Sequence, residues 1–549
     1  MKLSVLLWGI YFFFTLSVSA QEAPKEFTNP ILSGFYPDPS ICRVGDTYYM
    51  VNSSFEWFPG LPIHKSNDLV NWQLIGYGLS RPTQVEYKDD LQNSKGIFAP
   101  TIRYHNGKFY IITTMVGGKG NFIITSDNPE KGWSDPLWIK DAPGIDPSLF
   151  WDDDGICYYT GAGIVDGSEG EWPGKNGVWM QQIDPDKGVL LGEKKQLTYG
   201  HASNARWAEG PHIYKINGEY LLMLSEGGTN EYHAISVFNS KNILGPYIPN
   251  HANPVLTHRH LGENYPIVQT GHADLVQTQN GEWWSVMLAK RKVDGFCTLS
   301  RETFLAKVEM TVQESGVTPI FNPKKGLLQS HQPRPNLPYS PVVKQKGVDT
   351  FDSPLGLQWN FLKSPKYKWY ETKNGHLEIS LRKESLIELC NPSFIAQRVK
   401  HHDFIAEVKL NFTTDKSNEM AGISVYRMTG NNYQLMKTDN SIILYKVHNQ
   451  NVNTPNTLQL IAEIPYNSNS VILRLDVTGN IIKFFYGETT KNMVELSTGQ
   501  DYTILSDEAT KRFNGVYVGM YATSQGEESS NQATFKWFNY KVKSNQNIN

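Results

Sequence analysis

Cysteine is scarce in this chain, with 4 residues among 549, and the four are scattered along the sequence. They have neither the paired spacing of zinc ligands nor the density of a disulfide-stabilised domain. Cys42, Cys157 and Cys297 lie in apolar stretches typical of strands, where a free buried thiol is common. Together with Cys390, they therefore predict no disulfide framework and no cysteine-ligated metal.

An excess of charge of either sign is also missing. The chain has 51 Lys and Arg residues against 54 Asp and Glu residues, which gives a formal net charge of -3. Without a basic face there is no electrostatic attraction for nucleic acid, so neutral partners are favoured. Aromatic residues make up 12% of the chain; they suit stacking on sugar rings and equally suit the cores of β-sheets.

Several common catalytic motifs are absent. The sequence contains no G-x-S-x-G elbow, no P-loop, no H-E-x-x-H and no dinucleotide-binding glycine pattern. The clusters His258-Arg259-His260 and His401-His402 lack a third ligand at helical spacing. We expect these histidines to be solvated loop or strand-edge residues, and they indicate no function.

A long apolar run occurs near the N-terminus. Lys2 precedes the run Leu3 to Leu16, and Val18-Ser19-Ala20 follows it, which is the three-part form of a secretory signal peptide over residues 1–20. The alternative is a transmembrane anchor, but the run is short for a bilayer span. No cysteine lies at the expected cleavage point, so a lipid anchor is disfavoured. We expect an exported protein, in the periplasm or secreted, without a membrane anchor.

A short sequence motif occurs five times. Each copy begins with a polar or small residue, continues through an aliphatic residue and reaches a Gly turn that leads into aromatic residues. The copies open at Asp38-Pro39-Ser40-Ile41, Ala99-Pro100-Thr101-Ile102, Asp146-Pro147-Ser148-Leu149, Glu209-Gly210-Pro211-His212-Ile213 and His272-Ala273-Asp274-Leu275. The repeat period is about 58 residues. Helical repeats are the alternative, but β-branched and aromatic residues between Asn-Gly and Asp-Gly turns favour hairpins of strands.

One four-stranded sheet per repeat predicts a five-bladed β-propeller over residues 28–322, because radial repetition protects strand edges. The innermost strand of each blade lines the central channel. Asp38, Asp146, Glu209 and His272 should then occupy equivalent places and meet at one mouth of that channel. The alternative is that each Asp merely caps a turn, but three acids in equivalent openings favour a site.

Paired carboxyl groups suit the hydrolysis of a glycosidic bond, in which one protonates the leaving oxygen and the other, ionised, activates water or attacks the sugar. Three acids around one mouth repel one another, so the pKa of at least one should rise and make it the general acid. Arg301 could offset the remaining charge and bind sugar hydroxyls.

Proline marks the end of the first domain. Residues 323–347 have the composition of a Pro-rich linker. Residues 348–545 then alternate apolar and polar side chains in strands such as Phe404 to Phe412, where Glu407 falls on the face expected to meet water. This pattern over about 200 residues predicts an antiparallel β-sandwich.

Six ordered motifs in the chain resemble glycoside hydrolase family 43, in the branch of exo-acting β-xylosidases and α-L-arabinofuranosidases with a C-terminal sandwich. The motifs are Gly34–Ser40, Ser53–Gly60, Gly96–Ile102, Ile145–Ser148, Ala208–Pro211 and Gly271–Ala273. The resemblance implies an all-β fold, a five-bladed β-propeller followed by a concanavalin-like antiparallel β-sandwich. It implies hydrolysis of terminal pentosyl residues from oligosaccharides or polysaccharides with inversion.

The resemblance also assigns roles. It implies that Asp38 is the general base, Glu209 the general acid and Asp146 the residue that orients Glu209 and raises its pKa. Arg301 and Phe55 would bind the terminal sugar. His272 would lie on the channel axis beside a water-bound cation, and a structural calcium ion there is the one cation suggested; no cofactor is required.

Two aromatic residues bear on the choice of sugar. Phe98 stands where the family often has Trp, so a preference for xylose cannot simply be carried over. Phe513 is a candidate for a sandwich residue that narrows the pocket, although it could equally be a core aromatic. β-D-Xylose is the favoured terminal sugar and α-L-arabinofuranose the alternative. A non-catalytic sugar-binding propeller is disfavoured, because a binder has no need of mutually repelling acids.

Overall fold

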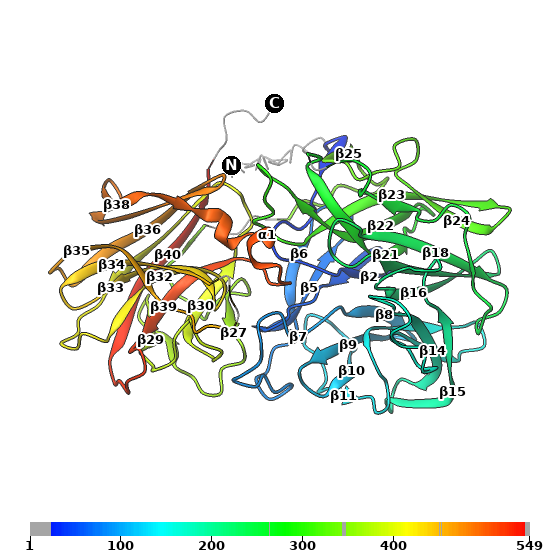
Figure 1. Ribbon diagram of the computed structural model, residues 1–549, viewed down its shortest axis with the longest axis horizontal. Coiled ribbons are helices and arrows are strands. Elements are labelled where there is room, and N and C mark those ends of the chain that lie inside the picture. The colour runs from blue at the N-terminus through cyan, green and yellow to red at the C-terminus, as the bar shows by residue number, and fades with distance from the viewer. Residues whose placement is uncertain (1–22, 263, 343–346, 450, 452, 544–549) are drawn as a thin grey trace, which may run out of the picture.

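The computed structural model describes residues 23–262, 264–342, 347–449, 451 and 453–543. The expected signal peptide, residues 1–20, lies outside this range. Two β-rich bodies lie side by side, the N-terminal one coloured blue to green and the C-terminal one yellow to red (Figure 1). None of the helices in the described ranges is long and apolar enough to cross a membrane.

Among the described residues, five antiparallel sheets make up the blades of the first body, and each is built from strands that lie close together in the sequence. Blade one comprises β2 (Ser40–Val44), β3 (Thr47–Val51), β5 (Gly60–Ser66) and β6 (Gln73–Leu79). Blade two comprises β7 (Gly96–Ile97), β8 (Thr101–His105), β9 (Lys108–Val116), β10 (Gly120–Ser126) and β11 (Leu137–Trp138). Blade three comprises β12 (Ile145–Trp151), β13 (Cys157–Ala162), β14 (Val178–Asp184) and β15 (Val189–Thr198).

Blade four comprises β16 (Glu209–Ile216), β17 (Glu219–Glu226), β18 (Ala234–Ser240), β19 (Ile248–Pro249) and β20 (Leu256–Thr257). Blade five comprises β21 (Ile267–Gln277), β22 (Trp283–Arg291), β23 (Glu302–Gln313) and β24 (Gly316–Phe321). The inner strands β2, β8, β12, β16 and β21 neighbour one another in this order, and β21 returns to β2. This ring confirms the five-bladed propeller predicted from the repeat.

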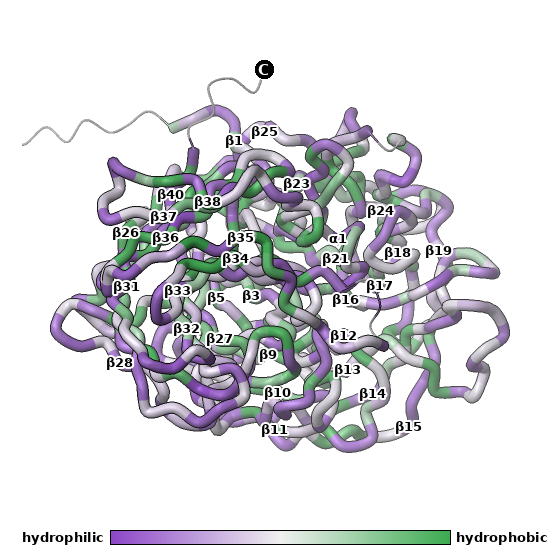
Figure 2. The backbone as a smooth tube through the Cα atoms, turned by 60° about the vertical axis from the view of Figure 1, so that its left-hand side comes forward, coloured by the Kyte–Doolittle hydropathy of each residue, from purple (hydrophilic) through white to green (hydrophobic). Residues whose placement is uncertain are grey.

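The hairpin turns explain the regular blades. Asn106 and Asn217 have φ of 48° and 52°, each followed by a Gly with positive φ, as a tight turn between antiparallel strands requires. Hydrophobic stretches fall mainly on inward strands, while peripheral loops are hydrophilic (Figure 2). The ring is tied across its ends by the N-terminal segment: Asn29 Nδ2 donates to Leu305 O at 2.9 Å, and β1 (Glu26–Thr28) pairs with β25 (His331–Pro333).

The second body is a sandwich of two eight-stranded antiparallel sheets in the described residues. One sheet contains β26 (Val348–Asp349), β28 (Tyr370–Thr372), β29 (Leu377–Ser380), β31 (Phe404–Asn411), β36 (Ser470–Thr478), β37 (Ile481–Thr489), β38 (Asn492–Asp501) and β40 (Gln532–Val542). The other contains β27 (Asn360–Leu362), β30 (Ser393–Arg398), β32 (Met420–Met428), β33 (Asn431–Lys437), β34 (Ser441–His448), β35 (Gln459–Pro465), β39 (Tyr517–Thr523) and β4 (Trp57–Phe58).

Strand β4 belongs to the first body by sequence but completes a sheet of the second. Phe58 and Trp57 pair with Phe361 and Leu362 of β27. The Trp57 ring stacks on Tyr517 with centroids 3.5 Å apart. The 3₁₀ turn η1 (Tyr502–Leu505) and the short helix α1 (Asp507–Thr510) lie on the same side of the sandwich, toward the propeller (Figure 1). The two domains are therefore joined by shared secondary structure.

The Pro-rich connection is held on the surface of blade one. Arg334 pairs with Asp68 at 2.7 Å, and the N–H of Ser340 donates to the same carboxylate at 3.0 Å. The four cysteines are free, as expected, and all but Cys390 are buried. Two residues that we expected to be exposed to solvent, His258 and Glu407, are instead buried.

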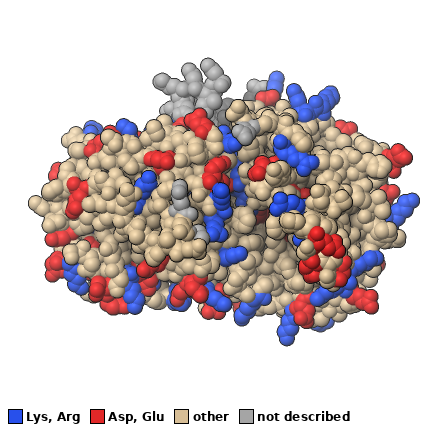
Figure 3. All heavy atoms as spheres, viewed as in Figure 1, with Lys and Arg blue, Asp and Glu red and all other residues tan. Residues whose placement is uncertain are grey.

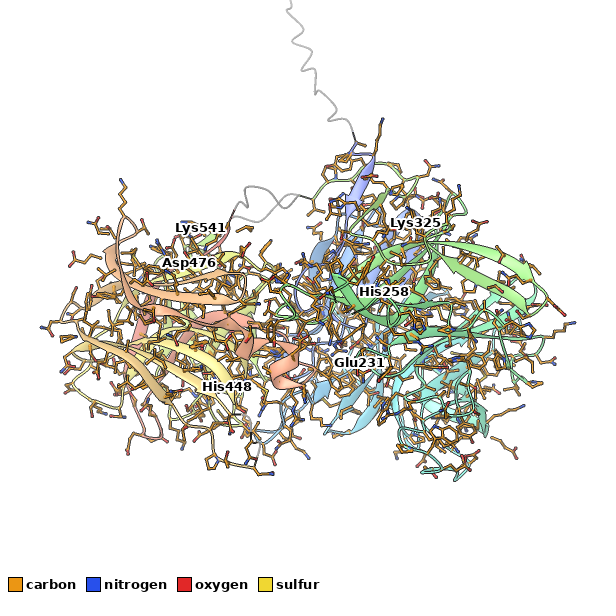
Figure 4. The ribbon with its side chains drawn as sticks, turned by 45° about the horizontal axis from the view of Figure 1, so that its top comes forward. Glu231, His258, Lys325, His448, Asp476 and Lys541 are labelled. Atoms are coloured by element: carbon orange, nitrogen blue, oxygen red, sulfur yellow. The ribbon has the colours of Figure 1, made fainter. Side chains whose placement is uncertain are left out.

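His258 is 4% exposed; it lies in the propeller (Figure 4). Its Nε2 accepts from the N–H of Leu328 at 2.9 Å, so it bridges two loops instead of meeting water. Glu407 is fully buried, because Arg474 on the adjacent strand and Lys541 hold its carboxylate at 2.7 and 3.0 Å. The alternating pattern could not reveal these partners.

Candidate active site

The residues that begin the inner strands meet at one mouth of the propeller. Three of the four predicted residues occupy equivalent positions there, and the fourth does not. Asp38, Asp146 and His272 occupy equivalent positions in the left-handed region, with φ of 52°, 52° and 48°. In blade four the equivalent left-handed position is Gly210, with φ of 60°. Glu209 stands one residue earlier, at a register shift between β16 and β17. An irregular strand therefore presents this acid differently from the other two.

A cavity of about 930 Å³ opens at this mouth. Its walls include all the residues that the sequence analysis selected, namely Asp38, Phe55, Phe98, Asp146, Glu209, His272, Arg301 and Phe513. The remainder of the wall comes from both domains. Figure 3 shows basic side chains gathered where the two domains meet, and Figure 4 places the wall residue Glu231 on the propeller side of that junction.

Asp38 is held by a donor at each carboxylate oxygen. Arg301 Nη1 donates to Oδ1 at 2.7 Å, and Ser53 Oγ donates to Oδ2 at 2.6 Å. Asp38 and Arg301 are 3% and 4% exposed. The buried carboxyl group of Asp38 thus accepts one charge-assisted and one neutral hydrogen bond.

The other two acids have raised pKa values. Burial, then repulsion from Asp38, raises the pKa of Glu209 to about 7, although Arg301 opposes the shift. Burial, then repulsion from Glu209 and Asp38, raises the pKa of Asp146 well above its usual range. Carboxyl groups crowded in a buried site cannot all ionise, so protons are retained near neutral pH. The site thus offers proton donors beside the base-like Asp38.

Three phenylalanine rings form one wall of the cavity. The Phe55 centroid lies 4.9 Å from that of Phe98 and 6.1 Å from that of Phe513. The Arg301 guanidinium lies 5.0 Å from the Phe55 ring and 5.2 Å from the Phe513 ring. Phe513 is 44% exposed, so it is a cavity residue contributed by the sandwich and not a core aromatic. Together these groups offer an apolar surface beside a fixed cation, which suits a sugar ring.

His272 lies against the backbone of blade four. A side chain at Gly210 would place its Cβ 3.0 Å from Cε1 of the imidazole, so glycine permits this approach. The N–H of His272 donates to Ser225 Oγ. Burial lowers the pKa of His272 despite the opposing charge of Asp38, so the ring is neutral at physiological pH.

A charged network that the sequence analysis missed crosses the channel between the inner strands. Arg103 donates to both oxygens of Asp274, at 2.8 and 3.1 Å, and its Nη2 lies 3.0 Å from His212 Nδ1. Ser40 and Tyr214 donate to the same carboxylate, each at 2.6 Å. Burial alone would raise the pKa of Asp274, but Arg103 holds it well below its usual range.

This network bears on the expected calcium ion. Calcium takes 6–8 oxygen ligands, but the Asp274 carboxylate is already occupied by Arg103, Ser40 and Tyr214. Across the described ranges, no group of three His, Cys, Asp or Glu side chains is arranged to hold a metal ion. Direct calcium coordination in the channel therefore does not fit these residues, while a water-bound cation beside His272 stays a prediction.

The sandwich contributes a second charged group that the sequence did not reveal. Asp507, at the start of α1, pairs with Lys290 of blade five and with Arg427 of the sandwich, the latter at 2.5 Å. Ser300 Oγ, beside Arg301, donates to it at 2.7 Å. Since these residues lie up to 217 positions apart (Lys290 to Asp507), no local pattern could have linked them.

Comparison with known proteins agrees with this architecture. Residues 27–315 match the model for glycosyl hydrolases family 43, and residues 348–541 match that for the beta xylosidase C-terminal concanavalin A-like domain. The chain is 38% identical to a xylosidase/arabinosidase from Butyrivibrio fibrisolvens, over 93% of this chain and 98% of that protein.

It is also 36% identical to a non-reducing end alpha-L-arabinofuranosidase from Bacteroides ovatus, over 98% of each chain. The solved structure of a xylan beta-1,4-xylosidase from Bacillus halodurans superposes with a TM-score of 0.86 at 32% identity, covering 94% of this chain and all of that one. With both domains matched in order and over nearly their full lengths, the chain belongs to glycosyl hydrolase family 43 and is a glycoside hydrolase.

Proposed function

We propose that this enzyme removes terminal β-D-xylosyl residues from xylose-containing oligosaccharides or polysaccharides with inversion at the anomeric carbon. The observation that carries the proposal is one buried cavity holding Asp38 between two donors, and Asp146 and Glu209 with raised pKa values. An inverting hydrolase needs this division, one ionised carboxylate and one protonated carboxyl.

Glu209 is the general acid. Its proton passes to the leaving oxygen as the bond from the anomeric carbon to that oxygen breaks. Asp38 is the general base: it takes a proton from water while the water oxygen bonds to the opposite face of the same carbon. Asp146 lies near Glu209, whose charge raises the pKa of Asp146, and it is the residue that orients this acid. Inversion leaves room for the water, so the two carboxyl groups should lie about 6.5–9.5 Å apart.

The aromatic wall and Arg301 would hold the terminal sugar. Phe55, Phe98 and Phe513 present ring faces or edges to the cavity, and the guanidinium between two of them can donate to sugar hydroxyls. His272, being neutral, can accept or donate a hydrogen bond. A cavity lined in this way suits one terminal sugar, so we assign exo action.

α-L-Arabinofuranosidase activity is the second candidate. It would use the same acids, and the relatives include proteins named for each activity. Phe98, in place of the Trp often found in the family, changes the wall that distinguishes the two pentoses. We also propose that the protein is exported, on the basis of the N-terminal sequence pattern alone.

The deciding experiment compares hydrolysis of an aryl β-D-xyloside and an aryl α-L-arabinofuranoside, with the first-formed anomer followed by NMR. Faster xylose release with α-xylose as the first product supports the proposal. β-Xylose as the first product contradicts inversion. Preferential arabinose release makes the second candidate correct, and release of neither sugar rejects both.

A further inference from the structure

A small polar cluster lies behind the aromatic wall, where the two domains meet. It consists of Glu56 from blade one, Ser94 from blade two and Asn514 from the sandwich. These residues are 1%, 5% and 0% exposed. They do not line the cavity, and the catalytic proposal gives them no role.

Glu56 accepts one hydrogen bond at each carboxylate oxygen. The N–H of Ser94 donates to Oε2 at 3.2 Å, and Asn514 Nδ2 donates to Oε1. Ser94 Oγ in turn donates to Asn514 Oδ1 and accepts from the N–H of Phe513 at 3.0 Å. The three residues are therefore joined pairwise in a buried place, with the link from Ser94 to Glu56 made by the backbone N–H of Ser94.

The cluster is adjacent in sequence to groups that face the proposed sugar site. Glu56 follows Phe55, and Asn514 follows Phe513. The carbonyl of Asn514 accepts from Ser300 Oγ at 2.7 Å, next to Arg301. Arg301 Nη2 donates to the Phe513 carbonyl at 3.2 Å.

The backbone around Phe55 shows that its position needs support. Phe55 has φ of 49° and Ser94 has φ of 67°, a region that non-glycine residues avoid at some cost. Phe55 and Ile97 exchange backbone hydrogen bonds at 2.9 and 3.0 Å. Strained backbone persists where its surroundings fix it, and here the carboxyl group of Glu56 supplies one link between the propeller and Asn514 of the sandwich.

We propose that Glu56 is a positioning residue: through Ser94 and Asn514 it fixes Phe55 and Phe513 on either side of Arg301, and so sets the affinity for the terminal pentose. The proposal rests on the proposed function, since it takes this end of the cavity as the sugar site. Glu56 touches no reacting atom. Its loss should weaken binding of the sugar more than it slows the chemical step.

Glu56→Gln is the direct test, because an amide can accept from one donor only and turns its own NH₂ toward the other. In the full-length protein we expect the KM for an aryl β-D-xyloside and the Kd for free D-xylose to rise about tenfold, with kcat within about threefold. Ser94→Ala removes the acceptor for the N–H of Phe513 and should also raise both KM and Kd. It provides a second test if Glu56→Gln does not fold.

A double variant separates positioning from general damage. In Glu56→Gln with Asn514→Asp, the amide and the acid exchange places: the new amide donates to the new carboxylate and still accepts from Ser94. This variant should recover most of the parent KM and Kd. Glu407→Gln is the matched control, since it removes another buried, fully bonded carboxylate; it should lower the melting temperature and leave both constants unchanged.

Unchanged KM and Kd in both Glu56→Gln and Ser94→Ala would overturn the proposal. So would a control that raises them as much, or a double variant no better than the single one. If the parent hydrolyses neither glycoside, the proposed function fails, while calorimetric titration with D-xylose still decides whether Glu56 sets pentose affinity.

Discussion

The propeller mouth and the sandwich differ in the partners that they give to buried acids. In the sandwich, Glu407 has Arg474 and Lys541 beside it, and Asp507 has two cations of its own. In the propeller mouth, three acids share Arg301, which pairs with Asp38. In the part of the chain that the structure describes, no ion pair joins a cation to Asp146 or Glu209.

The contrast distinguishes structural carboxylates from functional ones. Where a buried acid has its own neighbouring cations, these stabilise its ionised form, and the acid contributes to folding through that ion pair. An acid left to repel its neighbours weakens the fold, and such an arrangement is found where chemistry needs a shifted pKa. Burial alone does not separate the two groups, because Glu407 and Asp146 are both buried. Glu407 has two cations beside it, whereas among the described residues no ion pair reaches Asp146.

The strongest test of this contrast removes one acid of each kind. Asp38→Asn should lower kcat/KM for an aryl β-D-xyloside by about 10⁴-fold, the upper range for a lost general base. Its melting temperature should stay within a few degrees of the parent, because repulsion of Glu209 is relieved as the pair with Arg301 is lost. Glu407→Gln should do the reverse, keeping activity and losing stability. Steady-state kinetics and thermal unfolding of both variants check this, and comparable activity losses would abolish the distinction.

A second test asks what the paired acid at the domain junction contributes. Asp507→Asn leaves Lys290 and Arg427 buried without their carboxylate, which should cost about 3–5 kcal/mol in the free energy of unfolding. Denaturant unfolding measures the loss. Activity measured well below the transition should fall far less than in Asp38→Asn. The neighbouring Glu508→Gln is the control, and an equal loss of stability there would show that α1 is sensitive to any change.

Sequence reasoning succeeded where the fold repeats a local sequence pattern. The hairpin turns, the period and the strand openings predicted the blades, and all eight selected side chains line one cavity. The offset of Glu209 by one residue escaped it, because Gly210 takes the left-handed position that Asp38 and Asp146 take elsewhere, and only the backbone shows this.

Contacts between residues far apart in the sequence could not be predicted, for a different reason. In the sequence, Trp57 and Phe58 belong to a motif of the propeller. In the structure they complete a sheet of the sandwich, because they pair with residues about 300 positions away. The Arg103–Asp274 network and the surroundings of Glu56 likewise join residues from separate blades or domains. Periodicity describes which face of a strand is apolar; it carries no information on which distant charge meets it.

The buried acids of the propeller mouth and of the sandwich should also respond to pH in opposite directions. As the proposed general acid, Glu209 would have to be protonated to act. Because burial and Asp38 raise its pKa to about 7, kcat/KM should fall about tenfold per pH unit above pH 7. The pKa of Glu407 is shifted in the opposite direction. Burial would raise this pKa, but Lys541 and Arg474 hold it below its usual range. Its stabilisation is therefore present above the unfolded pKa of about 4.3 and is lost as pH falls through the folded value.

The measurements are a pH–rate profile of kcat/KM and melting temperatures of the parent and Glu407→Gln across pH. The melting-temperature difference between them should be large at pH 7 and shrink toward pH 3. An alkaline limb that begins near pH 5 would mean that Glu209 is not the acid whose pKa burial raises.

The smallest expected effect concerns the wall that both domains build. Phe98 is contributed by the propeller and meets Phe513 of the sandwich with centroids 6.5 Å apart, so Phe98→Trp enlarges the propeller's share of that wall while every acid stays in place. Because changes of this size in an apolar pocket discriminate weakly, the ratio of kcat/KM for the xyloside to that for the arabinofuranoside should shift by about 2–10-fold. Phe150→Trp, a half-buried ring of blade three outside the cavity wall, is the matched control. Paired assays of both glycosides check this, and an unchanged ratio would mean that the choice of pentose is made by the acids and Arg301 alone.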